Sequence, residues 1–260
     1  RNRSAIAQVR ASGAEVVLVT ARGFHRARPF ALELGLSLPI LCCGGALVAD
    51  SATGNTIVHR PLQPEFALPI LRFALERRLL ILLHHDGHYL AHPDTIAAYP
   101  DVAALVLPPW RSCADLDGLV RQGSTFLRVL GGSSVEQIRV AFEREFAERL
   151  RFVVLNWRGL PDLGIYDACV SKGNTLRAFC QERGVGQEEV MAIGDHISDA
   201  SMFEFAGIKI AMGNADVGLQ GLADYVTLSN TEDGVAVALE RFFDATEATA
   251  NAPIPPRPIA

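Results

Sequence analysis

Two aspartates four residues apart form the strongest chemical signal in the sequence. Asp195 and Asp199 lie in VMAIGDHISDASMFEFAG, where an apolar strand runs into Gly194 and a helix begins just beyond it. Residues four apart lie on one side of a helical turn. Two carboxylates at the carboxyl end of a parallel strand form a hard-oxygen site suited to Mg²⁺. The alternative is structural, with Asp195 capping the helix and Asp199 solvated in its first turn.

A lysine and a threonine have the chemistry to hold a phosphoryl group. Lys172, in CVSKGNTL, stands where a strand gives way to a helix, and its point charge suits a phosphoryl group or a cluster of carboxylates. Thr20 ends the apolar run VVLVT, and its hydroxyl and the backbone amides that follow can hold a phosphate oxygen. Arg22, two residues further on, could add positive charge. The structural alternatives are a surface lysine at a helix start for Lys172, a helix N-cap for Thr20 and a surface arginine for Arg22.

The elements that must position these residues fall into three stretches. Residues 1–60 read as helix, strand, helix, strand and a hairpin, and the strand at 15–20 is expected to be buried on both faces, as in parallel sheets. Residues 61–169 mix hairpins with helices, including a long helix at 133–150, which favours an inserted α+β domain. In residues 170–246 helices again alternate with short apolar strands, as in the first stretch. The expected fold class is α/β, a parallel-sheet core split by an α+β insert.

The composition disfavours several classes of protein, and the last residues differ in character from the rest of the chain. The proline-rich tail, residues 247–260, is expected to be disordered. Lys+Arg 24 against Asp+Glu 29 gives a net charge of −5, which disfavours electrostatic binding of nucleic acid. No apolar run approaches the roughly 20 residues of a membrane span. The five cysteines show no CxxC spacing, so we expect no disulfide framework and a cytoplasmic location.

Together these residues resemble the haloacid-dehalogenase (HAD) superfamily, in its Cof-like branch with a type IIB cap. Thr20 matches the second family motif, Lys172 the third, and Gly194-Asp195 with Asp199 the fourth. The segments AMGNA and SNTEDGVAVAL also look like this branch, and the resemblance covers nearly all of residues 4–245. It implies a Rossmann-like core with a large mobile cap inserted into it, and hydrolysis of a phosphate monoester with Mg²⁺.

The resemblance also implies a role for each matching residue. Thr20 and Lys172 would hold the phosphoryl oxygens, and Lys172 would also steady the nucleophile. Asp195 would bind Mg²⁺ directly, and Asp199 would support the metal or Lys172. The reaction would pass through an aspartyl-phosphate that water then cleaves. The other residues implied to bind substrate are Ala21, Arg22 and Asn214.

The family's first motif, Asp-x-Asp-Gly-Thr, has no counterpart before Thr20. The 19 preceding residues contain no aspartate. We therefore expect the nucleophile and the general acid to lie upstream of Arg1. Because the first strand is central in such folds, we also expect the strands at 15–20 and 189–193 to stand roughly 10 Å apart, two strand spacings, with a slot between them.

Three smaller features bear on the assignment. The stretch Asp115-Leu116-Asp117-Gly118 has the letters of the first motif, but it lies inside the insert and follows no buried strand, so we expect a surface loop. Ser198 stands where the family usually has Asn in its fourth motif, and Gly44 stands where Asn often precedes Gly-Ala. Both departures bear on the substrate more than on the reaction class.

Four histidines cluster in ILLHHDGHYLAH, at positions 84, 85, 88 and 92. We expect a polar hairpin whose alternate residues face solvent or substrate, and the alternative is a metal site. His84 and His85 would point to opposite faces of a strand, so all four could not converge. His85, Asp86 and His88 are candidates to face the catalytic edge of the core.

The sequence thus predicts a cytoplasmic, Mg²⁺-dependent phosphatase of a small phosphorylated metabolite, with a sugar phosphate as the candidate substrate. It would act as a monomer or homodimer, with no nucleic-acid or membrane partner. One alternative is a sugar phosphomutase of the same superfamily. Another is a non-catalytic phosphate-binding protein that lacks the first motif. The expected boundaries are 1–60 and 170–246 for the core and 61–169 for the cap.

Overall fold

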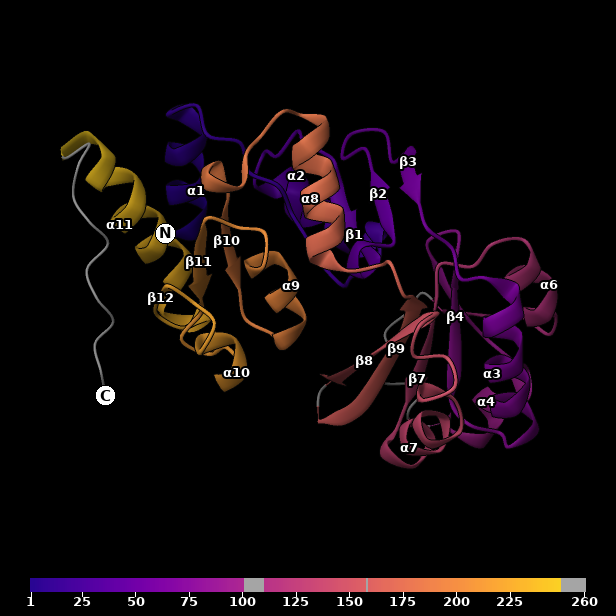
Figure 1. Ribbon diagram of the computed structural model, residues 1–260. Helices are drawn as coiled ribbons and strands as arrows, with labels where there is room; N and C mark the ends of the chain where they lie inside the picture. The colour runs from indigo at the N-terminus through magenta and orange to yellow at the C-terminus, as the bar shows by residue number, and fades with distance from the viewer. Residues whose placement is uncertain (101–109, 158, 249–260) are drawn as a thin grey trace.

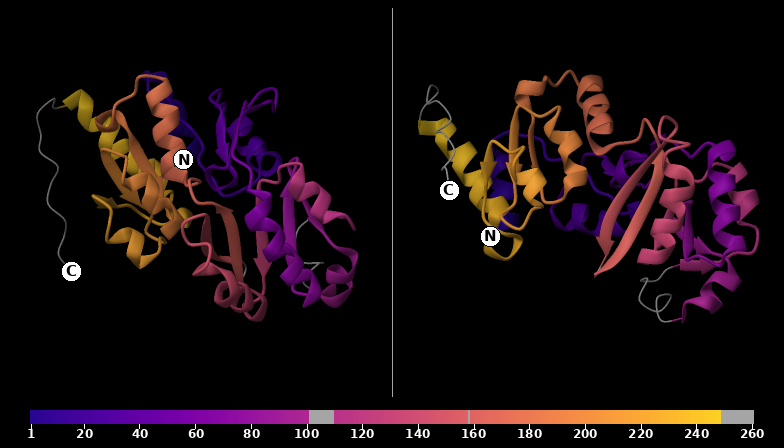
Figure 2. Two further views of the ribbon diagram at one scale, coloured as in Figure 1. Left: turned by 45° about the vertical axis from the view of Figure 1, so that its right-hand side comes forward. Right: turned by 60° about the horizontal axis from the view of Figure 1, so that its bottom comes forward.

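The computed structural model describes residues 1–100, 110–157 and 159–248, and Figures 1 and 2 show them in two lobes. The lobes are joined by the segments 60–63 and 168–171. One lobe holds two small sheets and helices from both ends of the chain, and the other holds a six-stranded sheet with its own helices. We call them the core and the cap. Within the described part of the chain, no helix is long and apolar enough to cross a membrane.

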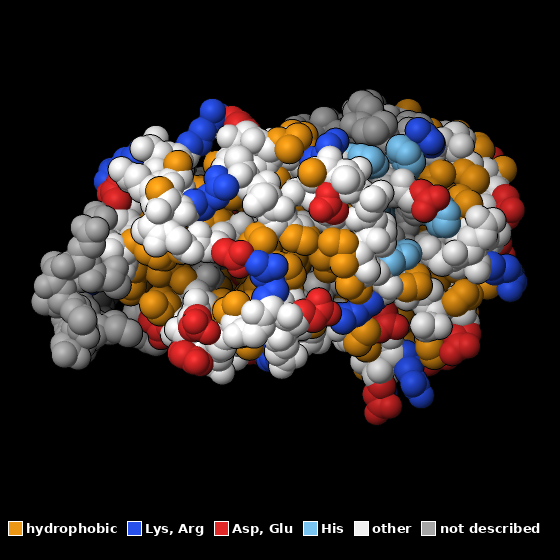
Figure 3. Space-filling view, turned by 90° about the horizontal axis from the view of Figure 1, so that it is seen from above, with side chains coloured by type: hydrophobic (Ala, Val, Ile, Leu, Met, Phe, Trp, Pro, Cys, Tyr) orange, Lys and Arg blue, Asp and Glu red, His pale blue; other side chains and the backbone are white. Residues whose placement is uncertain are grey.

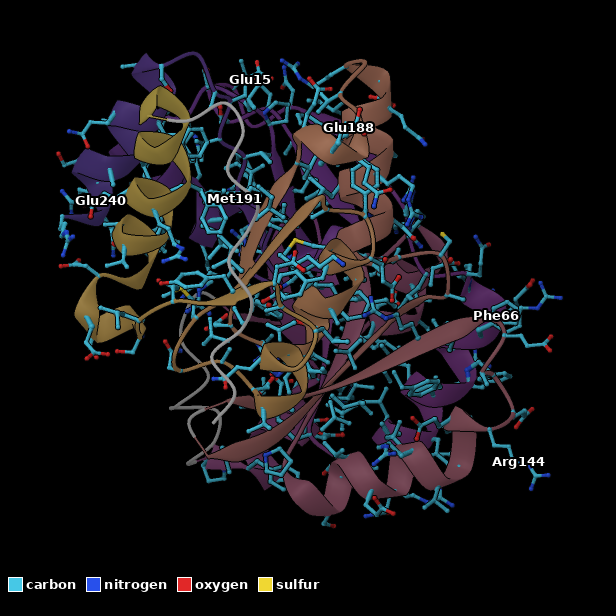
Figure 4. The ribbon with its side chains drawn as sticks, turned by 60° about the vertical axis from the view of Figure 1, so that its left-hand side comes forward. Glu15, Phe66, Arg144, Glu188, Met191 and Glu240 are labelled. Carbon is cyan, nitrogen blue, oxygen red and sulfur yellow. The ribbon has the colours of Figure 1, made fainter. Side chains whose placement is uncertain are left out.

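A parallel three-stranded sheet forms one half of the core. Its order is β10-β11-β12, with bounds Met191–Gly194, Ile208–Ala211 and Tyr225–Val226. Helices α1 (Asn2–Ala11) and α11 (Gly234–Ala248) pack together beside it through Ala5, Val9, Ala236 and Leu239. Arg1 forms an ion pair with Glu240 of α11, the residue labelled in Figure 4 on the side of that helix pair. The two ends of the described chain are therefore joined in the core.

The other half of the core is built around residues 15–20, which form less of a strand than expected. They pair in parallel with β1 (Ile40–Cys42) through a single bridge between Val19 and Leu41. Residues 16–19 are half-buried, so the expectation of burial on both faces was wrong. Within the described residues, no backbone hydrogen bond joins 15–20 to β10. Among the residues that the structure describes, this segment pairs on one side only, and a strand edge without a neighbour stays partly exposed. The separation between 15–20 and β10 stays a prediction.

The cap sheet has the order β6-β5-β4-β7-β9-β8, and its two faces pack against different parts of the molecule. Along β4, β7 and β9, side chains alternate between faces because successive residues of a strand point in opposite directions. One set packs under helices α3, α6 and α7 in an apolar cluster that includes Ile81, Leu127 and Ile165. The other set, with Leu82 and Phe126, packs against residues of the core. The cap sheet is thus covered by its own helices on one side and by the core on the other.

The remaining elements largely follow the sequence. The long helix expected at 133–150 is shorter, because α7 ends at Ile138, a π-helical turn spans Arg139–Glu143, and Leu150 already begins β8. Of the tail expected to be disordered, residues 247 and 248 belong to α11, and 249–260 lie outside the described residues. The other bounds are α2 Phe24–Glu33, β2 Leu47–Ala49, β3 Thr56–His59, α3 Pro64–Glu76, β4 Ile81–His85, β5 His88–Ala91, α4 Pro93–Ala98, β6 Trp110–Ser112, α6 Leu116–Arg121, β7 Phe126–Leu130, α7 Gly132–Ile138, β8 Leu150–Trp157, β9 Leu160–Asp167, α8 Lys172–Glu182, α9 Ala200–Phe203 and α10 Val217–Gln220.

Candidate active site

Lys172 and Asp199 form a buried ion pair at the edge of the core. The Nζ of Lys172 lies 2.5 Å from Oδ1 of Asp199, and both residues are buried. The pair depends on how α8 begins: the hydroxyl of Ser171 accepts a hydrogen bond from Asn174 N–H at 2.9 Å and caps the helix. A Cβ at Gly173 would lie 1.8 Å from the carbonyl oxygen of Ser201, so only glycine lets α8 approach α9 this closely.

The second carboxylate oxygen of Asp199 is held by the turn that follows β10. Its Oδ2 accepts backbone N–H bonds from Asp195 and His196, each at 3.1 Å. A Cβ at Gly194 would lie 2.6 Å from the Cβ of Asp199, so the glycine makes room for the aspartate to fold back over the strand end. Both oxygens of Asp199 are therefore engaged, and its carboxylate aims and charge-balances Lys172.

Asp195 is the aspartate that faces open space. It is exposed and lines a cavity of about 390 Å³ between core and cap. A carboxylate there has the hard-oxygen chemistry that Mg²⁺ prefers. Within the described residues, no group of three or more His, Cys, Asp or Glu side chains is arranged to hold a metal. Among the described residues Asp195 is thus a carboxylate open to the cavity, and a Mg²⁺ site there would need further ligands.

The core side of the same cavity is lined by residues that include Thr20, Ala21, Arg22 and Lys172. Thr20 is fixed to β1, because its N–H donates to Leu41 O at 2.8 Å. Its hydroxyl accepts from Arg22 N–H at 3.1 Å, and the N-cap of α2 is Gly23 rather than Thr20. The sequence alternative of an N-cap threonine was therefore wrong. The structure brings Thr20, Ala21, Arg22, Lys172 and Asp195 to one cavity.

Asn214 is the one expected substrate-binding residue that the structure does not bring to this cavity. It is exposed, and its Oδ1 accepts a hydrogen bond from Asn230 N–H at 2.8 Å. Asn214 therefore ties two loops of the core together. Its expected role in binding substrate rested on the resemblance alone.

Sequence reasoning missed His196 and gave little weight to Ser198, both of which line the cavity. His196 Nδ1 accepts from Ser198 N–H and lies 3.0 Å from Ser198 Oγ, while Nε2 is 3.8 Å from Asp216 Oδ2. The hydroxyl of Ser198, which stands in place of the usual Asn, therefore contacts His196. The only signal in the sequence was the position of His196 between the two motif aspartates.

The cap contributes a second ion pair that the sequence did not indicate, with a half-buried arginine and a buried aspartate. Arg128 of β7 binds Asp162 of β9 with two hydrogen bonds, Nε to Oδ1 at 2.8 Å and Nη2 to Oδ2. The guanidinium carbon lies 5.6 Å from the centre of the Tyr89 ring. Burial acts to lower the pKa of Arg128, but the hydrogen bond and charge of Asp162 outweigh it and raise that pKa above its usual value. The side chains of the cap that line the cavity include Tyr89, Phe126, Arg128, Asp162 and Tyr166.

The other sequence candidates in the cap lie elsewhere. Asp115 caps α6 by accepting from Gly118 N–H at 2.8 Å, and Asp117 pairs with Arg72 on the surface, so this stretch is a helix start rather than the expected loop. His85, Asp86 and His88 do not line this cavity, as far as the described residues show. His84 is fully buried, so the expectation of a polar hairpin facing solvent or substrate was wrong there.

The fold and the site define an α/β core with an inserted cap, and side chains of both line one cavity. A family model described as haloacid dehalogenase-like hydrolase matches residues 1–239, and the chain belongs to that family. It is 26% identical over 248 residues to pyridoxal phosphate phosphatase YbhA of Escherichia coli (strain K12), covering 89% of this chain and 87% of that protein. It is 26% identical over 265 residues to 5-amino-6-(5-phospho-D-ribitylamino)uracil phosphatase YwtE of Bacillus subtilis (strain 168), covering 92% and 90%.

A solved structure of a haloacid dehalogenase-like hydrolase from Bacteroides thetaiotaomicron is also similar. It superposes with a TM-score of 0.78 at 25% identity, covering 93% of this chain and 91% of that one. The resemblance drawn from the motifs is confirmed, and with it the α/β fold class with a HAD core and cap, and the assignment to HAD-like phosphatases.

Proposed function

We propose that this chain works in a Mg²⁺-dependent phosphatase that hydrolyses a small phosphorylated metabolite through an aspartyl-phosphate. The observation that carries the proposal is the convergence of Lys172, Asp195 and the Thr20–Arg22 loop on one cavity. A cation held by a buried carboxylate, a carboxylate open to the cavity and a turn rich in backbone amides together suit a phosphoryl group. The cap residues over the cavity exclude water and contact the leaving group.

The roles of the residues follow from their partners. Lys172 is fixed by Asp199, so its charge is aimed at the cavity without a cost of reorganisation during the reaction. Thr20, Ala21 and Arg22 bind the remaining phosphoryl oxygens. Asp195 holds Mg²⁺, which would neutralise charge on the phosphoryl oxygens when bound. Asp199 acts as the positioning residue for Lys172.

The nucleophile in this proposal lies upstream of Arg1, in a strand that pairs with the open edges of residues 15–20 and β10. Its carboxylate oxygen forms a bond to phosphorus as the ester oxygen leaves, and a second aspartate of the same segment protonates that oxygen. The second aspartate then takes a proton from a water molecule as this water attacks the phosphorus of the aspartyl-phosphate. The bond between phosphorus and the nucleophile's oxygen breaks, which releases inorganic phosphate and restores both carboxyl groups. The support is that each of these two strands pairs, within the described residues, on one side only.

The test measures release of inorganic phosphate by the full-length protein from a panel of phosphate monoesters that includes sugar phosphates, with Mg²⁺ and with EDTA. Replacing Asp195 with Asn should abolish metal-dependent release, and undiminished release would remove Asp195 from the mechanism. A phosphomutase would instead give sugar-phosphate isomers with little free phosphate. A non-catalytic binding protein would bind the esters and release nothing, which would overturn the proposal.

We also propose a cytoplasmic location and a monomeric or homodimeric state. The support for the location is that the five cysteines are free, three of them buried, which suits a reducing compartment. Sedimentation of the purified protein tests the oligomeric state. Fractionation of cells tests the location.

A further inference from the structure

Five of the seven histidines gather where the cap hairpin β4–β5 meets the start of α2. Figure 3 shows histidine side chains grouped on one part of the face seen from above. We call this group the imidazole joint, and its members are His25 of the core, His59 at the end of β3, and His84, His85 and His88 of the hairpin. The proposed phosphatase mechanism uses none of them.

The centre of the imidazole joint is His84, a wholly buried imidazole. Its relative exposure is 0%, and neither ring nitrogen has a hydrogen-bond partner within the described residues. The ring stacks on Phe126 with centroids 4.8 Å apart and meets Tyr89 edge-on at 5.2 Å. A buried polar group without a partner destabilises a fold and asks for an explanation. As a neutral ring, His84 packs like an aromatic residue, but as a cation it would be a buried, unpaired charge.

The imidazole joint connects the cap directly to the phosphate-binding loop. A Cβ at Gly23 would lie 3.0 Å from His84 Nε2, so the absence of a side chain lets the imidazole rest on the loop backbone. Gly23 is the N-cap of α2 and follows Arg22, which lines the cavity. On the outer side, His25 stacks on His88 with centroids 5.8 Å apart, and a Cβ at Gly87 would lie 2.7 Å from the His25 ring.

The charged groups around His84 oppose its protonation. Burial is the largest cause that lowers its pKa, to about 3, and His59, His88, His85 and His25 each lower it further by their charge. Burial also lowers the pKa of His59 and His88, and Arg111 adds to the effect on His88. Asp86 is the carboxylate that raises the pKa of both, and its side chain is exposed, 3.6 Å from His85 Nε2.

We propose that His84 is a positioning residue: as a neutral imidazole it seats the cap hairpin on Gly23 and holds the Thr20–Gly23 loop in its phosphate-binding arrangement, and protonation of the imidazole joint releases both. The inference takes from the proposed function only that this loop holds phosphate. A metal role for the joint is disfavoured, because no group of three ligands within the described residues could hold an ion.

The direction of the pH effect follows from linkage. Once exposed, His84 takes up protons below its ordinary pKa of about 6.5, whereas in the seated state it stays neutral down to about pH 3. The contribution of His84 to seating is therefore fully present above about pH 6.5 and is lost as the pH falls below that value. The ratio of released to seated protein should rise about 30-fold between about pH 7.5 and about pH 5, from His84 alone.

Hydrogen exchange of the chain measures this release without any turnover. The reporters are the N–H groups of Arg26 and Ala27, which bond to Gly23 O at 3.0 and 3.1 Å. After correction for intrinsic rates, their exchange should rise about 30-fold over that pH range. His84→Phe keeps the stacked ring but cannot be protonated, so the rise should fall to about 3-fold or less. An unchanged 30-fold rise in that variant, or no rise in the wild type, overturns the proposal.

Two controls keep the test decisive. His92→Asn should retain the full rise, since the contacts of the His92 ring are with Asp94 at the start of α4, and Asn keeps an acceptor for the Asp94 N–H there. Should His84→Phe fail to fold, titration of the His84 ring in the wild type by NMR replaces it. Neutrality to below about pH 4 supports the proposal, and an ordinary pKa near 6.5 overturns it.

Binding of sulfate separates this inference from the proposed function. Sulfate keeps its charge across the pH range, so a change in its affinity reports on the protein. As the pH is lowered, the affinity for sulfate should decrease in the wild type and stay nearly level in His84→Phe. If sulfate does not bind even at about pH 7.5 while the exchange follows pH as expected, the phosphate site fails and the imidazole joint stands. If sulfate binds, but neither its affinity nor the exchange rates change with pH, the inference on the imidazole joint is overturned and the proposed function is not.

Discussion

Two ion pairs flank the same cavity, a buried one from the core and a largely buried one from the cap. Lys172–Asp199 joins two elements of the core, and Arg128–Asp162 joins two neighbouring strands of the cap sheet. In the core pair, the carboxylate also accepts two backbone N–H bonds from its own turn. In the cap pair, both carboxylate oxygens bind the guanidinium. The core carboxylate is thus part of the backbone architecture, whereas the cap carboxylate serves mainly its arginine.

This difference predicts that the two pairs respond differently when both partners are removed. Replacing a buried pair by apolar residues is often neutral, while removing one partner leaves an unpaired buried charge. The rule should hold in the cap. It should fail in the core, where two backbone donors depend on the same carboxylate.

The largest effect is expected in the core. Lys172→Met should lower the free energy of unfolding by about 3–5 kcal/mol, because Asp199 stays buried and charged. Adding Asp199→Leu should not restore it, since the N–H groups of Asp195 and His196 then lack an acceptor at about 1–3 kcal/mol each. Urea titration of both variants measures this. Recovery to within about 1 kcal/mol of the wild type would show that the amides of the turn have other partners.

The cap pair should behave in the opposite way. Arg128→Met alone should cost about 3 kcal/mol, because Asp162 is left without a cation in a nearly closed site. The double variant Arg128→Met, Asp162→Leu should recover to within about 1 kcal/mol of the wild type. The same urea titration completes a double-mutant cycle. A double variant as unstable as the single one would erase the contrast between the two pairs.

Asp195 separates function from stability at the same site. It is exposed, so Asp195→Asn should change the free energy of unfolding by no more than about 0.5 kcal/mol. The same change should lower Mg²⁺-dependent phosphate release by the full-length protein at least about 100-fold, through loss of a metal ligand. Phosphate release and thermal unfolding measured on one preparation check both parts. A large loss of stability would mean that Asp195 also holds the turn.

The smallest effect is expected for an exposed pair that serves as a baseline. Arg72 and Asp117 are bound to each other on the cap surface, and both are substantially exposed. Their coupling energy in a double-mutant cycle with alanine should be about 0.5 kcal/mol and should fade at high salt. A coupling as large as that of the buried cap pair would show that burial is not what makes the difference.

The sequence was most informative where one short segment holds the geometry. Gly194, Asp195 and Asp199 lie close together in the sequence. Their spacing alone therefore brings the Asp199 carboxylate near the backbone N–H of Asp195, to which it is bonded. Lys172 could be placed because a helix start follows a strand there. The same local logic identified most helices and hairpins, whose glycines and prolines mark the turns.

What the sequence did not predict depends on partners far away in the chain. Arg128 and Asp162 meet because of the β7–β9 register, which no local pattern encodes. The burial of His84 needs Gly23 and Phe126 to close around it, and a histidine in a hairpin otherwise looks solvated. Residues 15–20 have the composition of a buried strand, but burial requires a neighbour on each side.

The two-faced cap sheet has a consequence for how this chain can change over evolutionary time. The side chains that hold the cap together lie under its helices, and those that line the cavity lie on the opposite face of the same strands. Successive residues of a strand point to opposite faces. A substitution on the cavity face can therefore change the shape and charge of the cavity while the residues just before and after it stay in the apolar layer. The cavity face still contributes to stability through the Arg128–Asp162 pair, so a substitution there acts on the fold through that pair and not through the apolar layer under the helices.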